Sequence, residues 1–359
     1  MRALVLWADE QSPNLGVRAL AEGTAALADR VWPGVEVVTQ NYGSSVAPVR
    51  FGDPRALARE WVTRREGMAA WLREFDVVLD TRSGDSFADI YGLMRLFVMS
   101  WAGEYVHRAA GVPLVLGPQT IGPFGGRRAR TLARASMRSA TLTMARDHLS
   151  AEHAASLGRP VDVLTTDVVF ALDVPERVPT HDVLLNVSGL LWRSGEHVDS
   201  AGYRATVQEL YDGLVARGRR VTLLAHVLDS PSEDNDVRAA REFAAAQDEP
   251  PALLTPTSLA EVRQQVAGAE LVIGSRMHAC LNALSVGTPA IPLAYSRKFE
   301  PLLESLAWDH LIDLRRDPAA ARTALALTDL GGLRERAGGV RDRAQELLVP
   351  AETALRRLG

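Results

Sequence analysis

The segment Leu271-Val-Ile-Gly-Ser-Arg-Met-His278 places two chemically different basic side chains two residues apart. Arg276 is a permanent cation whose planar guanidinium can bind a phosphate or a carboxylate through two parallel contacts. His278 can give or take a proton near neutral pH. The pattern predicts a buried strand that ends before Ser275 and a helix that begins at Arg276, where free N–H groups and the helix dipole attract anions. The segment is therefore a candidate site for phosphate chemistry.

Further basic residues follow other predicted strands. Lys298 and its neighbour Arg297 come directly after the strand that follows His278, and Arg146 ends a strand in the first half of the chain. In open parallel sheets, ligands bind beyond the carboxyl ends of the strands. We therefore expect Lys298 and Arg146 to approach one cleft from its two walls. A surface ion pair for each cation, and a core or capping role for His278, stay open as structural alternatives.

Three polar residues on predicted loops could contact a second substrate. Asp85 follows the strand that ends at Asp80, Asn14 precedes the first predicted helix, and Gln119 lies in a loop whose glycines and prolines predict rigidity. Asp85 and Asn14 fit turn or helix capping as well as substrate contact.

The elements that must position these residues alternate between strand and helix, which is typical of a parallel sheet covered by helices. In the first half the predicted strands are Ala3–Trp7, Val35–Thr39, Asp76–Asp80, Pro113–Gly117 and Leu142–Ala145. The predicted helices between them are Val17–Val31, Pro54–Phe75, Phe87–Ala110 and Arg127–Arg138.

The alternation breaks at the proline-flanked segment Val174–Pro179 and then restarts, which predicts a linker between two domains. The second set of strands is Val183–Val187, Val221–Ala225, Leu271–Gly274, Ala290–Ala294 and Leu311–Leu314. The second set of helices is Gly202–Arg217, Pro231–Gln247, Ser258–Ala267, Arg276–Val286 and Phe299–Leu306. We expect an N-terminal domain over residues 1–176, a C-terminal domain over 180–330 and a terminal helix over 331–359.

Composition narrows the function class. The chain has 359 residues, 47% of them hydrophobic, a formal net charge of −4 and a single cysteine. The charge gives no bulk attraction to nucleic acid, and one cysteine excludes an intramolecular disulfide. The sequence contains no apolar run of about 18 residues and no signal-peptide pattern, so we expect a cytoplasmic protein. Peripheral contact with a membrane and formation of a homo-oligomer stay open.

Several short blocks of the chain together resemble the polysaccharide pyruvyl transferase family. These blocks are Asn14-Leu-Gly16, Asp80–Gly92, Gly117–Pro123, Ala145–Ser150, Asp167–Phe170 and Gly274–His278. The resemblance implies two Rossmann-like α/β domains with parallel sheets facing a central cleft, as in GT-B glycosyltransferases, with acceptor residues on the N-terminal side and donor residues on the C-terminal side. The segment Thr81-Arg-Ser83 departs from the glycine-richer turn of many relatives, which weakens a phosphate-cradling role for that loop.

The resemblance also implies a reaction. Family members use phosphoenolpyruvate as donor and need no metal or other cofactor, and they build a pyruvate ketal on a sugar. Arg276, Ser275, Arg146, Lys298 and Arg297 would bind the donor, with Arg276 and Lys298 also contributing to catalysis, and His278 would be the general acid. Asn14, Asp85 and Gln119 would contact the acceptor, a polysaccharide or cell-envelope glycan precursor linked to a lipid or a nucleotide.

Two other functions fit the same sequence. One is a nucleotide-sugar glycosyltransferase of the same fold, and the other is a non-catalytic relative that binds an anionic metabolite.

Overall fold

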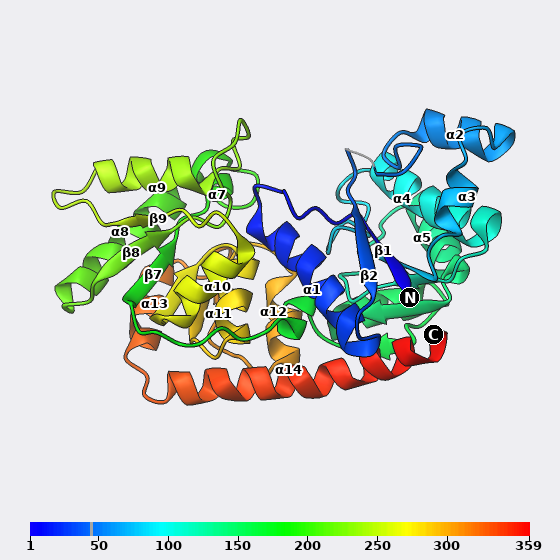
Figure 1. The fold of residues 1–359 in the computed structure, drawn as a ribbon. Helices are drawn as coiled ribbons and strands as arrows, with labels where there is room; N and C mark the ends of the chain where they lie inside the picture. The colour runs from blue at the N-terminus through cyan, green and yellow to red at the C-terminus, as the bar shows by residue number, and fades with distance from the viewer. Residues whose placement is uncertain (44–45) are drawn as a thin grey trace. The chain divides into compact units, whose positions relative to one another are not determined.

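The computed structural model describes residues 1–43 and 46–359. They form two compact α/β units (Figure 1). The first unit comprises Met1–Gln11, Leu20–Leu172 and Gln345–Gly359, and the second comprises Ser12–Ala19 and Asp173–Ala344. Ser12–Ala19 thus belongs to the second unit although residues of the first unit flank it in the sequence, and Gln345–Gly359 belongs to the first unit although it follows the second. No sequence pattern indicated this division.

The first unit is built on a parallel sheet of six strands in the order β2-β1-β3-β4-β5-β6. The strands are β1 (Arg2–Leu6), β2 (Glu36–Gln40), β3 (Val77–Asp80), β4 (Leu114–Leu116), β5 (Leu142–Ala145) and β6 (Val163–Leu164). Its helices are α1 (Leu15–Val31), α2 (Pro54–Thr63), α3 (Met68–Leu72), α4 (Leu93–Tyr105), α5 (Arg127–Ser139) and α6 (His148–Ser156). The first residues of α1 belong to the second unit.

The second unit is also built on a parallel sheet of six strands, but in a different order, β12-β11-β10-β7-β8-β9. The strands are β7 (His181–Asn186), β8 (Val221–Leu224), β9 (Leu253–Leu254), β10 (Ala269–Gly274), β11 (Ala290–Ala294) and β12 (Ile312–Asp313). The helices are α7 (Gly189–Arg193), α8 (Ser200–Ala216), α9 (Asp236–Ala245), α10 (Leu259–Ala267), α11 (Met277–Ser285), α12 (Phe299–Ser305), α13 (Ala320–Thr328) and α14 (Leu333–Leu355), and the last residues of α14 belong to the first unit.

Buried strands form the cores of both units, as the near-continuous apolar runs predict. All residues of β3 to β5, β10 apart from Glu270, and β11 are buried.

The helix predicted over Pro54–Phe75 is two helices, because Arg64 adopts a left-handed conformation and Gly67 begins the next one with a φ of 78°. The helix predicted over Ser258–Ala267 is confirmed as α10, and the Ser258 side chain caps its start by accepting a hydrogen bond from the Glu261 amide.

No helix of the described residues is both long enough and apolar enough to cross a bilayer.

Candidate functional site

The sheet of the second unit has a topological switch point between β7 and β10. The chain leaves β7 toward β8 and β9 on one side and returns to β10, β11 and β12 on the other. At such a point the connections diverge and leave a crevice at the carboxyl ends of the strands, where ligands bind. Asn186 ends β7, Gly274 ends β10, and these two residues pair in register. Ser275, Arg276 and His278 follow immediately, so three of the candidate residues named from the sequence lie at this edge.

Arg276 is fixed by its backbone as well as by its side chain. It precedes α11 in an extended conformation, and its amide donates a hydrogen bond of 2.9 Å to Asn186 Oδ1. Its guanidinium donates to Asp236 Oδ1 from Nε at 3.1 Å and from Nη2 at 2.7 Å. The residue is 7% exposed, so the ion pair lies in a largely desolvated environment.

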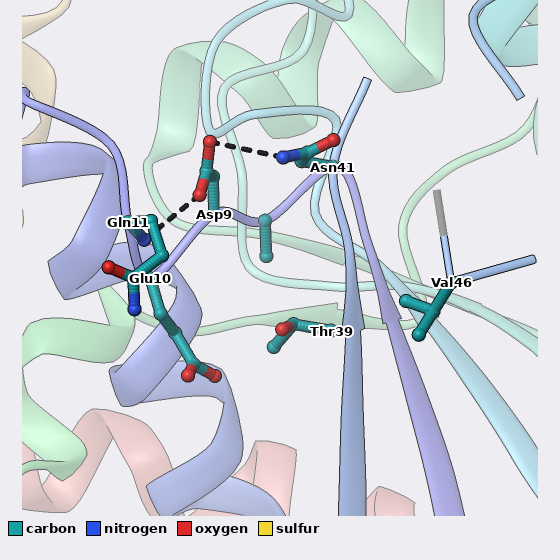
Figure 2. A pocket seen from close by; sticks show the side chains of 7 residues that line it. Asp9, Glu10, Gln11, Thr39, Asn41 and Val46 are labelled. Carbon is teal, nitrogen blue, oxygen red and sulfur yellow. Dashed lines mark hydrogen bonds between the residues drawn. The ribbon is translucent and has the colours of Figure 1, made fainter. Parts of the chain in front are cut away.

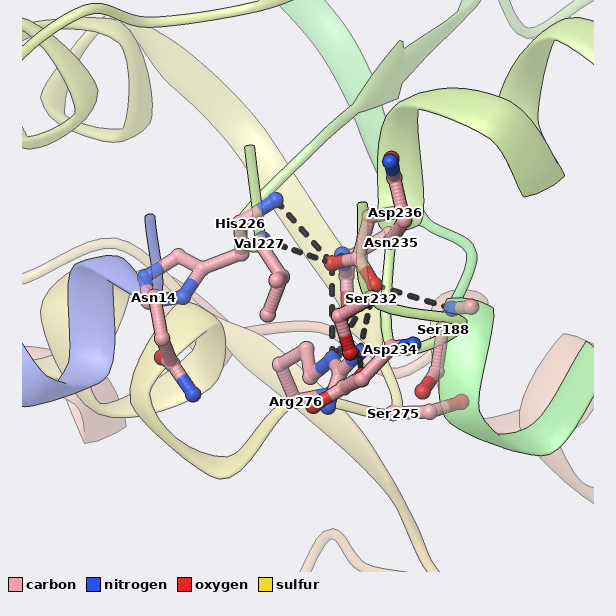
Figure 3. A network of polar contacts seen from close by, with 12 residues as sticks. Asn14, Ser188, His226, Val227, Ser232, Asp234, Asn235, Asp236, Ser275 and Arg276 are labelled. Atoms are coloured by element: carbon pink, nitrogen blue, oxygen red, sulfur yellow. Dashed lines mark hydrogen bonds and ion pairs between the residues drawn. The ribbon is translucent and has the colours of Figure 1, made fainter. Parts of the chain in front are cut away.

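Asp236 is the centre of this network, as Figure 3 shows. Besides Arg276, its carboxylate accepts hydrogen bonds from the backbone amides of Gly189, His226 and Val227 and from Asn186 Nδ2. Burial raises the pKa of Asp236, but the Arg276 guanidinium and the hydrogen bonds outweigh burial, so the pKa is lowered. Asp236 is therefore a fully buried carboxylate that stays ionised and holds Arg276 in place.

A second carboxylate, Asp234, contacts Arg276 Nη2 from the more open side. The Asp234 side chain is 36% exposed, whereas that of Asp236 is fully buried. Burial lowers the pKa of Arg276, but the charges of Asp236 and Asp234 outweigh burial and raise it. Arg276 is thus a permanent cation with one inner and one outer carboxylate partner.

His278 lies in the first turn of α11, next to the N-terminal segment of the chain. Leu15 N donates to His226 O at 3.0 Å, which ties this segment to the second unit. A Cβ added to Gly16 would lie 3.0 Å from His278 Nδ1. The glycine therefore allows the backbone of α1 to approach the imidazole closely, and Asn14 is brought to the same neighbourhood.

A second histidine, His226, is buried behind this site. Asn282 Nδ2 lies 3.2 Å from His226 Nε2, and Asn282 Oδ1 accepts a hydrogen bond from Arg263, which fixes the orientation of the amide. His226 Nε2 is therefore an acceptor. Burial and then the charge of His278 lower the pKa of His226 to about 3, so this imidazole is neutral at physiological pH.

Ser275 is fully buried, and its hydroxyl lies 2.9 Å from the Tyr203 hydroxyl. Tyr203 also accepts a hydrogen bond from the Ser188 amide, and burial raises its pKa to about 12. Ser275 is thus part of a hydrogen-bonded support beneath the turn that carries Arg276.

Arg297 and Lys298 follow β11, the strand next to β10, and Lys298 precedes α12. Both residues are half-buried. The structure therefore places Arg297, Lys298 and Arg276 along the carboxyl edge of one sheet.

The remaining predicted residues, apart from Asn14, lie at the carboxyl edge of the first unit. Arg146 is 1% exposed and donates from Nη1 to Asp167 Oδ2 at 2.7 Å and from Nε to Thr120 Oγ1 at 3.0 Å. The Arg146 amide donates a hydrogen bond to Gln119 O, and the Thr120 amide donates one to Gly84 O. These hydrogen bonds join the loops that carry Arg146, Gln119 and Asp85. Asp147 caps α6 through a hydrogen bond from the Ser150 amide.

The Gln119 side chain is fully buried, yet neither of its amide atoms has a hydrogen-bond partner among residues 1–43 and 46–359. An unsatisfied buried amide costs about 1–3 kcal/mol, and such groups mark sites that require an explanation.

The loop before Asp85 is strained. Arg82, Ser83 and Gly84 have φ values of 47°, 50° and 80°. Left-handed backbone at non-glycine residues is costly and is concentrated at functional sites. The buried ion pair of Arg82 with Asp80 supports this conformation.

The first unit also contains a polar cavity of about 350 Å³ (Figure 2). It follows the carboxyl end of β1 and is lined by Ala8, Asp9, Glu10, Gln11, Thr39, Asn41 and Val46. Asn41 Nδ2 donates to Asp9 at 3.2 Å. Among residues 1–43 and 46–359, the lining has carboxylate, amide and hydroxyl groups and no cation, so it suits a hydroxyl-rich ligand better than an anion.

Three residues of this site, Asp236, His226 and Tyr203, were not predicted from the sequence. Asn235-Asp236 at the start of an apolar periodic segment signals a helix N-terminus, which Asn235 indeed caps. Nothing in that pattern pairs Asp236 with Arg276 forty residues later, because the pairing depends on the order of β7, β8 and β10 in the sheet.

Known structures share this fold. A putative UDP-N-acetylglucosamine 2-epimerase from Listeria monocytogenes is 12% identical with a TM-score of 0.59, covering 99% of this chain and 97% of the other. The Anabaena protein HepE, solved with UDP and glucose, is 12% identical with a TM-score of 0.56, covering 99% and 98%. The spinosyn rhamnosyltransferase SpnG is 14% identical with a TM-score of 0.53, covering 100% and 99%. At these identities the likeness shows the fold, that of GT-B glycosyltransferases.

None of the curated proteins matches the sequence. A sequence model of the family described as polysaccharide pyruvyl transferase matches residues 14–297. The match begins at Asn14, which lies near His278, and ends at Arg297, one residue before Lys298. It spans most of the chain, and the chain therefore belongs to the polysaccharide pyruvyl transferase family.

Proposed function

We propose that the protein transfers the pyruvate unit of phosphoenolpyruvate to two hydroxyls of a sugar in a polysaccharide or cell-envelope glycan precursor, which forms a cyclic ketal. The observation that carries this proposal is that a permanently charged Arg276 and His278 both lie at the switch point of the second sheet. This turn is inside the region that matches the family.

The reaction can be balanced with these groups. His278 protonates C3 of the enol, which makes C2 electrophilic, and the first sugar oxygen bonds to C2 and loses its proton back to the enzyme. The bond between C2 and the phosphate oxygen then breaks, the second hydroxyl oxygen bonds to C2, and the phosphate leaves with the second proton. The products are the ketal and inorganic phosphate, with no change in oxidation state that would require a redox partner.

The donor carries a phosphate and a carboxylate, which need fixed cations. In the proposal Arg276, Lys298 and Arg297 bind them at the edge of the second sheet, and Arg146 adds a cation in the first unit. Ser275 acts through its bond to Tyr203 by supporting the Arg276 turn.

Asp234 sets a condition on donor binding. It occupies the more open side of the Arg276 guanidinium, where an incoming donor anion would compete with it. Asp236 stays in place because it is fully buried and accepts several other hydrogen bonds. In the proposal the donor displaces Asp234 and keeps the Asp236 contact.

For the acceptor, the polar cavity of the first unit is the best-supported site, because sugar hydroxyls bind carboxylate and amide groups. Asp85 and the unsatisfied amide of Gln119 are further acceptor contacts in the same unit, and Asn14 contributes from beside His278.

A thermal shift titration separates this proposal from its main alternative. Phosphoenolpyruvate on its own should raise the melting temperature in a concentration-dependent way, whether or not a nucleoside diphosphate also does so. The fold likeness to HepE, which was solved with UDP, favours a nucleotide-sugar glycosyltransferase as the second candidate. Stabilisation by UDP alone would support that candidate and count against pyruvyl transfer.

A further inference from the structure

Five apolar side chains are exposed within eight residues around the start of α4. Their exposed fractions are Ile90 61%, Tyr91 46%, Leu93 45%, Met94 64% and Phe97 36%. Leu93, Met94 and Phe97 follow helical spacing and so share one face of α4. Single exposed apolar residues are ordinary, but a contiguous group of this kind marks an interaction surface. We call these five residues the α4 patch.

The α4 patch lies next to the start of α5. Asp89, which directly precedes the patch, accepts hydrogen bonds from the amides of Gly125 at 2.7 Å and Gly126 at 3.3 Å, and Arg127 begins α5 one residue later. Both helices follow strands of one parallel sheet, and α4 packs against α5. The two helix starts are therefore side by side.

Helix α5 adds a dense positive charge beside the patch. Its arginines are Arg127, Arg128, Arg130, Arg134 and Arg138, and all five are exposed. The sequence contains no Asp or Glu from 90 to 103 or from 125 to 146. No acidic residue within these two segments therefore offsets the positive charge of the arginines.

Some of these arginines also line a cavity of about 360 Å³, together with Thr131 and Leu157. Arg130 donates to Ser156 O at 2.9 Å and Arg134 donates to Leu157 O, which holds two of the guanidinium groups at the rim. Held guanidinium groups are well suited to phosphate.

We propose that the α4 patch and the α5 arginines together dock the protein onto an anionic lipid bilayer. The apolar side chains enter the boundary between headgroups and acyl chains, and the arginines bind lipid phosphates. A second copy of the chain fits this surface poorly, because a symmetric contact would bring two rows of arginines together. The inference does not depend on the identity of the reaction, since binding to lipid is measured without substrate.

Flotation of the full chain with vesicles tests this docking. The protein should float with vesicles of phosphatidylcholine mixed with phosphatidylglycerol, bind pure phosphatidylcholine much less, and be released by high salt. Replacing Arg127 or Arg128 with Ala should weaken binding about fivefold each. The double variant Leu93→Ser with Met94→Ser should weaken it about tenfold or more.

Two matched controls lie on α2 of the same unit. Val62 is 84% exposed and the Arg59 side chain is 66% exposed. Val62→Ser and Arg59→Ala therefore remove an apolar side chain and a positive charge outside the proposed docking surface, and they should leave vesicle binding unchanged. The proposal is overturned if the wild-type chain does not float with anionic vesicles, or if the α4 and α5 variants behave like the controls. It is also overturned if sedimentation shows that patch variants dissociate an oligomer while their lipid binding stays intact.

Discussion

At the scale of single residues, the environment of Arg276 explains how one cation can be both fixed and available. Asp236, which also accepts hydrogen bonds from three backbone amides and from Asn186, binds it from the buried side, and Asp234 binds it from the side that a ligand can reach. The two carboxylates are two residues apart in the sequence, yet they should respond to mutation in opposite directions.

Asp234→Asn should strengthen the binding of phosphoenolpyruvate several-fold with little loss of stability, because it removes a partly exposed competing charge. Asp236→Asn should lower the free energy of unfolding by about 3 kcal/mol and weaken donor binding, because it breaks a buried ion pair and releases Arg276. Calorimetric titration and chemical denaturation measure the two effects. Weaker donor binding in Asp234→Asn would contradict the competition.

His278 should affect turnover far more than donor affinity. In His278→Gln, kcat should collapse while the dissociation constant of phosphoenolpyruvate stays within about tenfold, because a general acid acts in the transition state. His107→Gln is the matched control, since His107 is exposed at the end of the α4 region. Near-normal turnover in His278→Gln would show that another group supplies the proton.

The buried His226 predicts a pH dependence of stability. In the unfolded chain this imidazole takes up a proton near pH 6.5, whereas in the folded protein burial delays protonation to about pH 3. The unfolded state therefore binds more protons between these values, so the stabilising contribution is complete above pH 6.5 and is lost as the pH falls toward 3.

Between pH 6.5 and pH 5 the wild-type protein should lose about 2 kcal/mol more free energy of unfolding than His226→Gln, which keeps an acceptor but cannot titrate. Urea denaturation at both pH values measures this difference. Equal losses in the two proteins would mean that His226 is protonated in the folded state.

At the scale of elements, the N-terminal segment is more than a strand-to-helix connection. The backbone of Pro13 and Leu15 bonds to the loop after β8, and this brings Gly16 against His278. Gly16→Ala should lower kcat by displacing the imidazole, while the protein stays folded. Gly339→Ala in α14, where an added Cβ meets nothing within 4 Å, should leave kcat unchanged and raise stability by about 1 kcal/mol. Unchanged kcat in Gly16→Ala would show that this contact does not position His278 for catalysis.

The strands were the most predictable elements. Leu142–Ala145 and Ala290–Ala294 are confirmed with identical bounds, because long apolar runs between turn residues have few alternatives. The two-residue strands β6 and β9 were missed, since such short pairings carry no periodic signal. The helix predicted over Phe87–Ala110 begins only at Leu93 and becomes a π-helix at Val106, a change in backbone geometry that side-chain spacing does not reveal.

The candidate site was predictable only in part. The turn carrying Arg276 and His278 could be located, because a strand followed by a helix defines its position along the chain. The partners Asp236, Tyr203 and His226 come from α9, α8 and the segment after β8, and only the sheet order brings them to the same edge. The left-handed run at Arg82 and Ser83 was also unpredictable, since these residue types rarely adopt it.

At the scale of the whole molecule, each unit has a six-stranded parallel sheet whose first strand lies inside the sheet with a switch point beside it, although the strand orders differ. The fold is shared with glycosyltransferases and with an epimerase, so it does not decide the reaction. In the proposed function the residues at the strand ends make the distinction, because a fixed cation and a histidine there suit an anionic donor that must be protonated.

The most direct test is to incubate the protein with carbon-13-labelled phosphoenolpyruvate and a panel of lipid-linked and nucleotide-linked sugars, and to follow the products by NMR and mass spectrometry. Labelled carbon should appear in a ketal on one acceptor, with one inorganic phosphate released per ketal and with both products lost in His278→Gln. Transfer of a sugar from its nucleotide, with phosphoenolpyruvate left unconsumed, would contradict pyruvyl transfer and identify a glycosyltransferase.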